Sequence, residues 1–175
     1  MTNHEIVFKP LREEDLTLLF QWFQKEHVLR WYARGQGYTL EMIKEKYRPR
    51  LDDPDLKSYI IHIHDKPVGY IQLYRLSSYF PEGISDYSHP LFSLFQPHEL
   101  AGIDLFMADE NYLGKGYASK ALMCFVQACV KNEFRALLAD PSKENSRAIA
   151  FFMRNGFREV ESPYPHDHAI MLLKW

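Results

Sequence analysis

The sequence predicts one mixed α/β domain over residues 1–175. Segments with strand-like alternation of apolar residues interchange along the chain with segments whose apolar residues recur at helical spacing. The expected order of elements is β-α-α-β-β-β-α-β-α-β, without an internal repeat, linker or low-complexity run. A length of 175 residues with 46% hydrophobic residues suits one sizeable core.

The N-terminal half is expected to form a strand, two helices and a hairpin. The first strand ends at a proline, which cannot continue a sheet ladder. Apolar residues from Leu16 to Phe23 follow at helical spacing, and Thr39 suits the N-cap of a second helix. The Asp65-Lys66 turn between two alternating runs predicts the hairpin. The expected ranges are the strand 6–11, the helices 13–24 and 38–50, and the strands 58–64 and 68–76.

The C-terminal half begins with residues 77–99, which show no period and form a long loop of a functional or mobile kind. A helix joins the strands 101–108 and 135–139, so these two strands should be parallel and adjacent. Asn155-Gly156 ends the last helix. The expected ranges are the strand 101–108, the helix 115–131, the strand 135–139, the helix 146–154 and the strand 169–174; one further strand over 157–161 is left open.

Composition excludes several functional classes. A formal net charge of -2 argues against a nucleic-acid binder, which carries a basic excess. No apolar stretch is long enough to span a bilayer, and the first residues lack the features of a secretion signal, so a cytoplasmic protein is expected. The expected assembly is a monomer or a homodimer. Cys124 and Cys129 lie about 140° apart on their helix, which predicts free thiols.

A glycine turn precedes the long helix. Residues 111–118 read Asn-Tyr-Leu-Gly-Lys-Gly-Tyr-Ala, and glycines there let backbone N–H groups approach an anion, to which the helix N-terminus adds about half a positive charge. This pattern predicts a pyrophosphate cradle; the alternative is that Gly114 and Gly116 serve turn geometry alone. A P-loop motif is absent from the sequence, and Ser119 replaces the third glycine of the dinucleotide fingerprint.

A second cluster lies in residues 145–157. Taken with the glycine turn, it resembles the GNAT superfamily of N-acetyltransferases, which carries (Q/R)-x-x-G-x-(G/A) and later N-x-x-A-x-x-x-Y-x-x-x-G-F. The matching residues are Gly114, Gly116, Asn145, Ala148, Gly156 and Phe157. The resemblance covers nearly the whole chain and is strongest to aminoglycoside 6′-N-acetyltransferases, through residues 27–32, 44–47, 68–70, 102–104, 113–116 and 140–142.

This resemblance implies a mostly antiparallel central sheet with helices on both faces and two parallel strands splayed around acetyl-CoA. Acetyl-CoA would be a co-substrate, no metal would be needed, and the acceptor would be a small cationic amine such as the 6′-amine of an aminoglycoside. The residues implied in binding CoA are Leu105, Phe106, Met107, Leu113, Gly114, Lys115, Gly116, Tyr117, Ala118, Asn145, Ala148 and Phe152.

For catalysis, Asp104 matches the acidic residue of the aminoglycoside enzymes and is expected to be the general base; the alternative is a carboxylate that only attracts a cation. A backbone N–H in residues 105–107 would polarise the thioester carbonyl. Asn111 replaces the usual Gln or Arg of the first motif. Phe152 replaces the family's proton-donating tyrosine, which leaves water, another hydroxyl, or departure of an unprotonated thiolate with a pKa near 8.5.

A polycationic acceptor calls for carboxylates and aromatic rings. The candidates are Trp31, Tyr32, Tyr47, Asp86, Glu99, Asp140 and Asp167; the alternatives are that the tyrosines belong to the core and that Asp140 caps a turn. His62 and His64 share a strand face without an evident third ligand, and residues 166–168 are expected to form an exposed turn, so no metal site is predicted.

Two competing functions remain open at this point. An acyltransferase for a siderophore hydroxylysine or for a protein N-terminus would share the same motifs. A CoA-binding regulatory module would also fit, with Phe152 as the trace of a lost catalytic acid.

Overall fold

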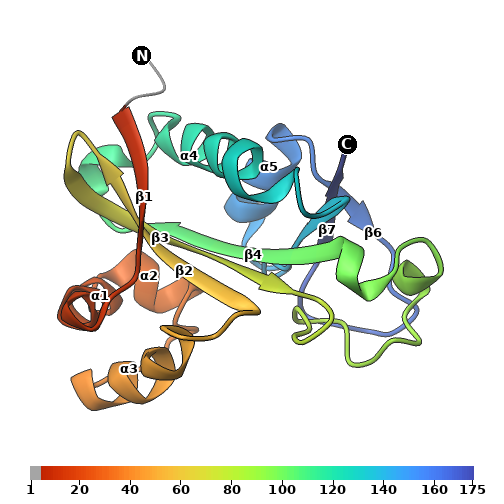
Figure 1. The fold of residues 1–175 in the computed structure, drawn as a ribbon, viewed down its shortest axis with the longest axis horizontal. Coiled ribbons are helices and arrows are strands. Elements are labelled where there is room, and N and C mark those ends of the chain that lie inside the picture. The colour runs from red at the N-terminus through yellow and green to blue at the C-terminus, as the bar shows by residue number, and fades with distance from the viewer. Residues whose placement is uncertain (1–4) are drawn as a thin grey trace. The chain divides into compact units, whose positions relative to one another are not determined.

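The computed structural model describes residues 5–175. These residues form a sheet of seven strands in the order β1-β2-β3-β4-β5-β7-β6 (Figure 1). Residues 1–4, where no secretion signal is predicted, lie outside the described residues. β4 pairs in parallel with β5, and β1–β2, β5–β7 and β6–β7 pair antiparallel, which confirms a mixed, mostly antiparallel sheet. The strands are β1 (Ile6–Pro10), β2 (Leu56–Ile63), β3 (Lys66–Arg75), β4 (Leu100–Met107), β5 (Ala136–Ala139), β6 (Arg158–Val160) and β7 (Ile170–Lys174).

The helices follow the sequence pattern with one addition. A 3-10 turn, Glu13–Asp15, precedes the first helix. The six residues of α2 are too few to show a helical period, which is why this helix was not predicted. The helices are α1 (Leu16–Phe23), α2 (Glu26–Trp31), α3 (Leu40–Tyr47), α4 (Tyr117–Phe125) and α5 (Ser146–Arg154).

Side-chain caps fix where two helices begin. The Thr39 Oγ1 accepts a hydrogen bond from the Met42 N–H at 3.2 Å, as expected for an N-cap. Asn145 caps α5 in the same way, since its Oδ1 accepts the Ala148 N–H at 3.1 Å. The predicted cap at Thr39 is confirmed, although α3 begins at Leu40 and not at residue 38, and α5 begins at Ser146 as predicted.

The continuous α-helix expected over 115–131 was wrong in its last part. After Phe125 the backbone continues as a π-helix over Val126–Val130, and the Lys131 N–H donates to the Val126 carbonyl at 3.1 Å. The wider turn buries Val126 and Val130 and leaves Cys129 half-buried. Cys124 and Cys129 are both free thiols, as predicted.

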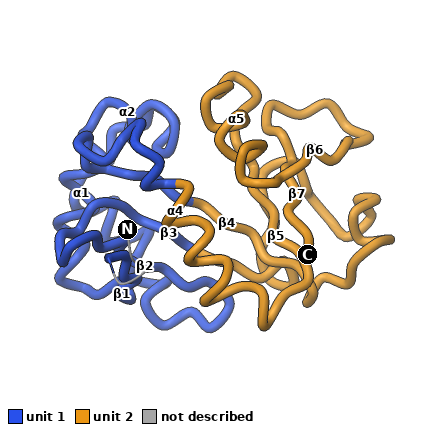
Figure 2. Tube along the Cα trace, turned by 90° about the horizontal axis from the view of Figure 1, so that it is seen from above, with its two compact units in different colours: residues 1–72, 105–118 blue, residues 73–104, 119–175 orange. Residues whose placement is uncertain are grey.

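The described chain divides into two compact units (Figure 2). Unit 1 comprises residues 1–72 and 105–118, and unit 2 comprises residues 73–104 and 119–175. In unit 1, Phe23, Ile43 and Tyr47 belong to a core of fully buried side chains. In unit 2, Phe125 and Phe157 are fully buried. The single domain over 1–175 stays a prediction.

Length and apolar character together decide whether a helix can cross a bilayer. Within residues 5–175 the structure contains no helix that meets both requirements.

Candidate functional site

Two carboxyl groups meet at one edge of unit 2. Asp104 lies on β4, and Asp140 directly follows β5. The two strands are parallel with Leu100 opposite Ala136, so their carboxyl ends lie at the same edge of the sheet. A side-chain hydrogen bond joins the two half-buried carboxyl groups. The structure thus brings together two residues that the sequence had proposed for different roles.

This pairing controls the protonation of Asp140. Burial raises the pKa of Asp140 well above its usual range, and the charge of Asp104 raises it further. Two close carboxylates cannot both ionise freely, so they share a proton. The raised pKa of Asp140 favours its protonated form, which can donate to the Asp104 carboxylate.

Glu82 and Tyr74 extend the carboxyl pair. The Glu82 backbone N–H donates to the Asp140 Oδ2 at 2.6 Å. Burial raises the pKa of the Tyr74 hydroxyl, and the carboxylates of Asp140, Asp104 and Glu82 raise it further. These four residues are called the acidic cluster below. Sequence reasoning missed Glu82 because it lies in the aperiodic loop, and Tyr74 because strand alternation does not distinguish a site residue from a core residue.

The Tyr74 ring is placed by a glycine on the neighbouring strand. A Cβ at Gly102 would lie 2.0 Å from the Tyr74 Cζ, so only glycine admits the ring at this position. The ring is 5% exposed. Gly102 therefore lets Tyr74 lie close to β4, two residues before Asp104.

Replacing Gly102 by Ala is expected to lower the free energy of unfolding by about 1–3 kcal/mol, because the new methyl group overlaps the Tyr74 ring. Thermal unfolding measures the loss. Gly37→Ala is the matched control, since no atom lies within 4 Å of a Cβ built there, and its change should stay below about 0.5 kcal/mol. Equal Tm values for the two variants would contradict the packing argument.

The glycine turn lies in unit 1. Gly114 and Gly116 have φ angles of 68° and 82°. Both glycines are exposed, and nothing lies within 4 Å of a Cβ built on either one. Asp109 anchors the turn through an ion pair with Lys66 at 2.7 Å and by accepting the Asn111 N–H at 2.9 Å. Alternating left-handed glycines turn successive N–H groups toward one side, which is the geometry of an anion-binding nest.

The other predicted turn residues flank these glycines. Lys115 is exposed. Leu113, before the glycines, is half-buried, and so are Tyr117 and Ala118 at the start of α4. The turn is therefore open to solvent at its glycines and packed at its two ends.

At the end of β4 the larger side chains are buried in unit 1, so a ligand at this point would meet the backbone of these residues. Phe106 and Met107 are 8% and 4% exposed, and Leu105 is half-buried. His27 Nε2 lies 2.8 Å from the Met107 carbonyl oxygen. The Val68 carbonyl accepts the N–H groups of both residues that follow the strand, at 2.7 and 3.1 Å. One residue opposite two is the pattern of a β-bulge.

In unit 2, two residues of the second motif, Asn145 and Phe152, have structural roles. The Asn145 side chain caps α5 through the Ala148 N–H. Phe152 is 8% exposed, and its ring packs at centroid distances of 5.2 Å from Phe151 and 5.1 Å from Phe157. Phe152 is therefore a packed ring that offers no proton.

Two of the proposed acceptor residues have structural roles. Tyr47 is fully buried in the core of unit 1, so the expected contact between Tyr47 and an acceptor was wrong. Glu99 accepts the Gln96 N–H at 2.8 Å and pairs with Arg135 at 3.2 Å, and these contacts lower its pKa. Glu99 precedes β4, whereas Asp104 lies further along it, so Glu99 stabilises the start of the strand.

The remaining candidates differ in exposure. Trp31 is half-buried under the Arg30 guanidinium, which lies 4.6 Å from the ring centroid. Tyr32 packs edge-on against Phe106 at 4.5 Å. Asp86 is exposed, and its carboxylate accepts the N–H of a serine two residues further on. Asp167 is exposed too, so only Asp140 among these candidates lies in the acidic cluster.

Comparison with known proteins places these features in context. The family described as Acetyltransferase (GNAT) domain matches residues 12–162. Aminoglycoside N(6′)-acetyltransferase type 1 from Klebsiella pneumoniae is 26% identical over 177 residues, covering 99% of this chain and 84% of the relative. The protein of the same name from Serratia marcescens gives the same values, 26%, 99% and 84%.

Solved structures give the same picture. Aminoglycoside acetyltransferase AAC(6′)-Ib in complex with coenzyme A is similar at a TM-score of 0.78 and 26% identity, with 97% of this chain and 94% of that chain covered. AAC(6′)-Ib in complex with ribostamycin and coenzyme A is similar at a TM-score of 0.80 and 25% identity, with coverage of 97% and 93%.

Proposed function

The chain belongs to the GNAT acetyltransferase family, and from this premise we propose that it transfers the acetyl group of acetyl-CoA to the 6′-amine of an aminoglycoside. The coarser function is that of an acetyl-CoA-dependent N-acetyltransferase. The observation that carries the proposed acceptor is the acidic cluster, in which Asp104, Asp140 and Glu82 lie together. Similar proteins act on aminoglycosides, and one is solved with ribostamycin.

The acidic cluster suits a cationic amine for two reasons. Its carboxyl groups attract a polycation, and Asp104 accepts a proton from the ammonium, whose pKa is about 10 in water. The amine lone pair then forms the C–N bond while the C–S bond of the thioester breaks. In balance, R–NH3⁺ and acetyl-S-CoA give the N-acetyl amine, HS-CoA and H⁺.

The glycine turn suits the diphosphate of CoA. Acetyl-CoA supplies the acetyl group as an activated thioester. The N–H groups of residues 114–118 would hold its pyrophosphate, since the turn leaves space at Gly114 and Gly116. In β4, a backbone N–H of residues 105–107 would polarise the thioester carbonyl, because Asp104 directly precedes them on the same strand.

Replacing Gly116 by Ala is expected to raise the KM for acetyl-CoA by about 10-fold, with kcat within about twofold of wild type. At a φ of 82°, an L side chain is strained, so the amides turn away from the phosphate. Steady-state kinetics measure the effect. Gly35→Ala is the control, because Gly35 has a φ of 73° and open space like Gly116 but lies outside the turn. A similar KM for both variants would contradict the nest.

A panel of amines tests the proposed acceptor. Release of CoA thiol is measured with an aminoglycoside that has a 6′-amine, one that has a 6′-hydroxyl, a hydroxylated lysine and a peptide N-terminus. The 6′-amine should give a kcat/KM at least about 10²-fold above the others, and NMR of the product should show acetylation of that nitrogen. Faster turnover of the peptide or the hydroxylysine would refute the aminoglycoside, and no thiol release with any amine would refute transfer itself.

A further inference from the structure

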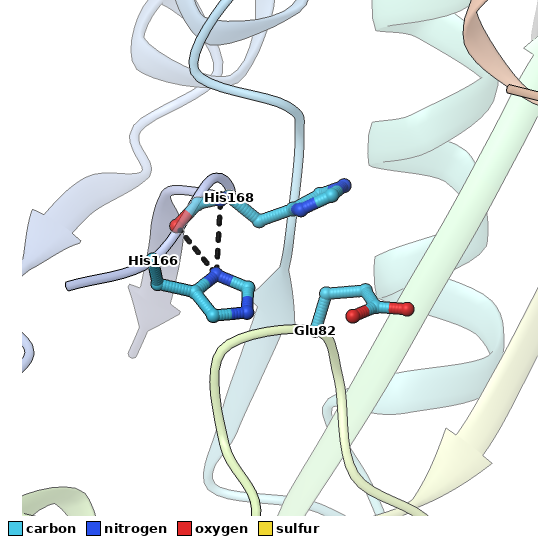
Figure 3. Close-up of side chains that lie close together, drawn as sticks. All are labelled: Glu82, His166 and His168. Carbon is cyan, nitrogen blue, oxygen red and sulfur yellow. Dashed lines mark hydrogen bonds between the residues drawn. The ribbon is translucent and has the colours of Figure 1, made fainter. Parts of the chain in front are cut away.

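We propose that Glu82, His166 and His168 form a binding site for a divalent transition metal ion, with Zn²⁺ as its best occupant. One ligand atom of each residue lies within 4.8 Å of the other two. All three residues are half-buried in unit 2, so the two histidines do not form the exposed turn that the sequence predicted. In Figure 3 the three side chains lie close together and come from two separate segments of the chain.

Backbone hydrogen bonds hold both segments in place. Glu82 is fixed by its N–H bond to the Asp140 carboxylate at 2.6 Å. The histidine segment is fixed by the bridge between Ser142 and His168 and by the 2.8 Å bond from the Ala169 N–H to the Pro141 carbonyl. A metal would therefore bind to ligands whose backbones are already positioned.

The His166 ring is held by contacts between its Nδ1 and the backbone of His168. Its Nδ1 lies 3.0 Å from the His168 N–H and 3.4 Å from the His168 carbonyl oxygen. Its second ring nitrogen lies on the side of Glu82 (Figure 3). Ligating histidines donate the proton of the other ring nitrogen to a backbone carbonyl. In this geometry the His168 N–H donates to Nδ1, so zinc binding requires the Nδ1–H tautomer, in which Nδ1 donates to the His168 carbonyl and the Nε2 lone pair is available to the metal.

The ligand types select the metal. Two imidazoles and a carboxylate suit Zn²⁺, whereas Mg²⁺ and Ca²⁺ prefer oxygen ligands alone. Three protein ligands with a fourth open position also match the form of an exchangeable zinc site. Tetrahedral zinc with bonds of about 2.0–2.1 Å places its ligand atoms about 3.4 Å apart. The three ligand atoms lie within 4.8 Å of one another, so any pair wider apart than about 3.4 Å has to close by side-chain rotation, which makes binding weaker than at a structural zinc site.

A metal here would affect the acidic cluster. It would occupy the Glu82 carboxylate, whose charge acts on Asp140, and it would add positive charge where a cationic amine is expected. Zinc should therefore inhibit transfer competitively with the amine and not with acetyl-CoA. This consequence rests on the proposed function, whereas binding of the metal does not.

Binding is tested with the full chain after treatment with a chelator. Isothermal titration with ZnCl2 should show one ion per chain with a Kd on the order of 10 μM, and Co²⁺ should give the visible absorption of a tetrahedral site. Glu82→Gln and His166→Ala should each weaken binding by about 10-fold or more. His166→Asn serves if the alanine variant fails to fold.

His98→Ala is the matched control, because His98 is an exposed histidine within the 3-10 turn Pro97–Glu99, and this variant should bind zinc like wild type. Equal zinc affinity in wild type and in His166→Ala, or loss of zinc in His98→Ala, would overturn the site. Intact zinc binding without acetyl transfer would instead refute the proposed function. Transfer by a wild-type chain that binds no zinc would refute the metal site alone.

Discussion

The Asp104→Asn variant is expected to show a kcat for acetyl transfer about 10²-fold or more below wild type, with the KM for acetyl-CoA unchanged. Asparagine has nearly the shape of aspartate and keeps a hydrogen-bonding partner for Asp140. It cannot accept a proton, however, so the acceptor ammonium would lose the base that makes it a nucleophile. Steady-state kinetics with a varied amine at saturating acetyl-CoA measure kcat and the KM for the amine, and kinetics with varied acetyl-CoA at a saturating amine measure the KM for acetyl-CoA.

The control for this variant removes a carboxylate of the same unit without touching the acidic cluster. Glu159 is exposed on β6 and serves this purpose as Glu159→Gln. This variant should keep its kcat, which excludes a general effect of lost negative charge. If Asp104→Asn kept its kcat and only the KM for the amine rose, Asp104 would bind the acceptor and another group would be the base.

The second large effect concerns stability. Asp140→Asn is expected to raise the free energy of unfolding by about 1–3 kcal/mol at pH 8, or about 5 °C in Tm. The folded state raises the pKa of Asp140 through burial and through the charge of Asp104. Between the unfolded pKa, near 3.9, and the raised folded value, the folded protein binds more protons, so wild-type stability falls as the pH rises.

Asparagine avoids this cost because it carries no charge, and its oxygen can still accept the Glu82 N–H. The Tm difference between Asp140→Asn and wild type should therefore shrink as the pH is lowered toward 4, and Glu159→Gln should show no such trend. Thermal unfolding at several pH values measures both. A variant less stable than wild type at pH 8 would mean that the Asp140 carboxylate stabilises the fold.

The features predicted best from the sequence are those that depend on residues close together in the chain. The period of residues 146–154 and the Asn155-Gly156 stop predict α5 with the observed bounds. The helix between β4 and β5 required these strands to be parallel, and they are. Both features depend on residues close together in the chain, which a pattern can reveal.

The candidate site was predicted less completely, because it depends on contacts between distant segments. Glu82 meets Asp140 and His166 across an aperiodic loop, and no spacing rule connects them. Helical spacing placed Tyr47 on the apolar face of its helix but could not say whether that face meets the core or a ligand; it meets the core. Residue type indicated the chemistry, whereas burial decided which residues are available for it.

The π-turn at Val126–Val130 has a consequence for chain length. A π-turn holds one residue more than the α-turn it replaces. The helical segment therefore contains one residue more than a regular α-helix would need to connect its buried N-terminal part with Phe134, the buried residue that precedes β5. Loss of one residue there would convert the segment to regular α-helix and leave both ends where they are, so this stretch can absorb a deletion that a straight helix would transmit to its neighbours as a rotation of about 100°.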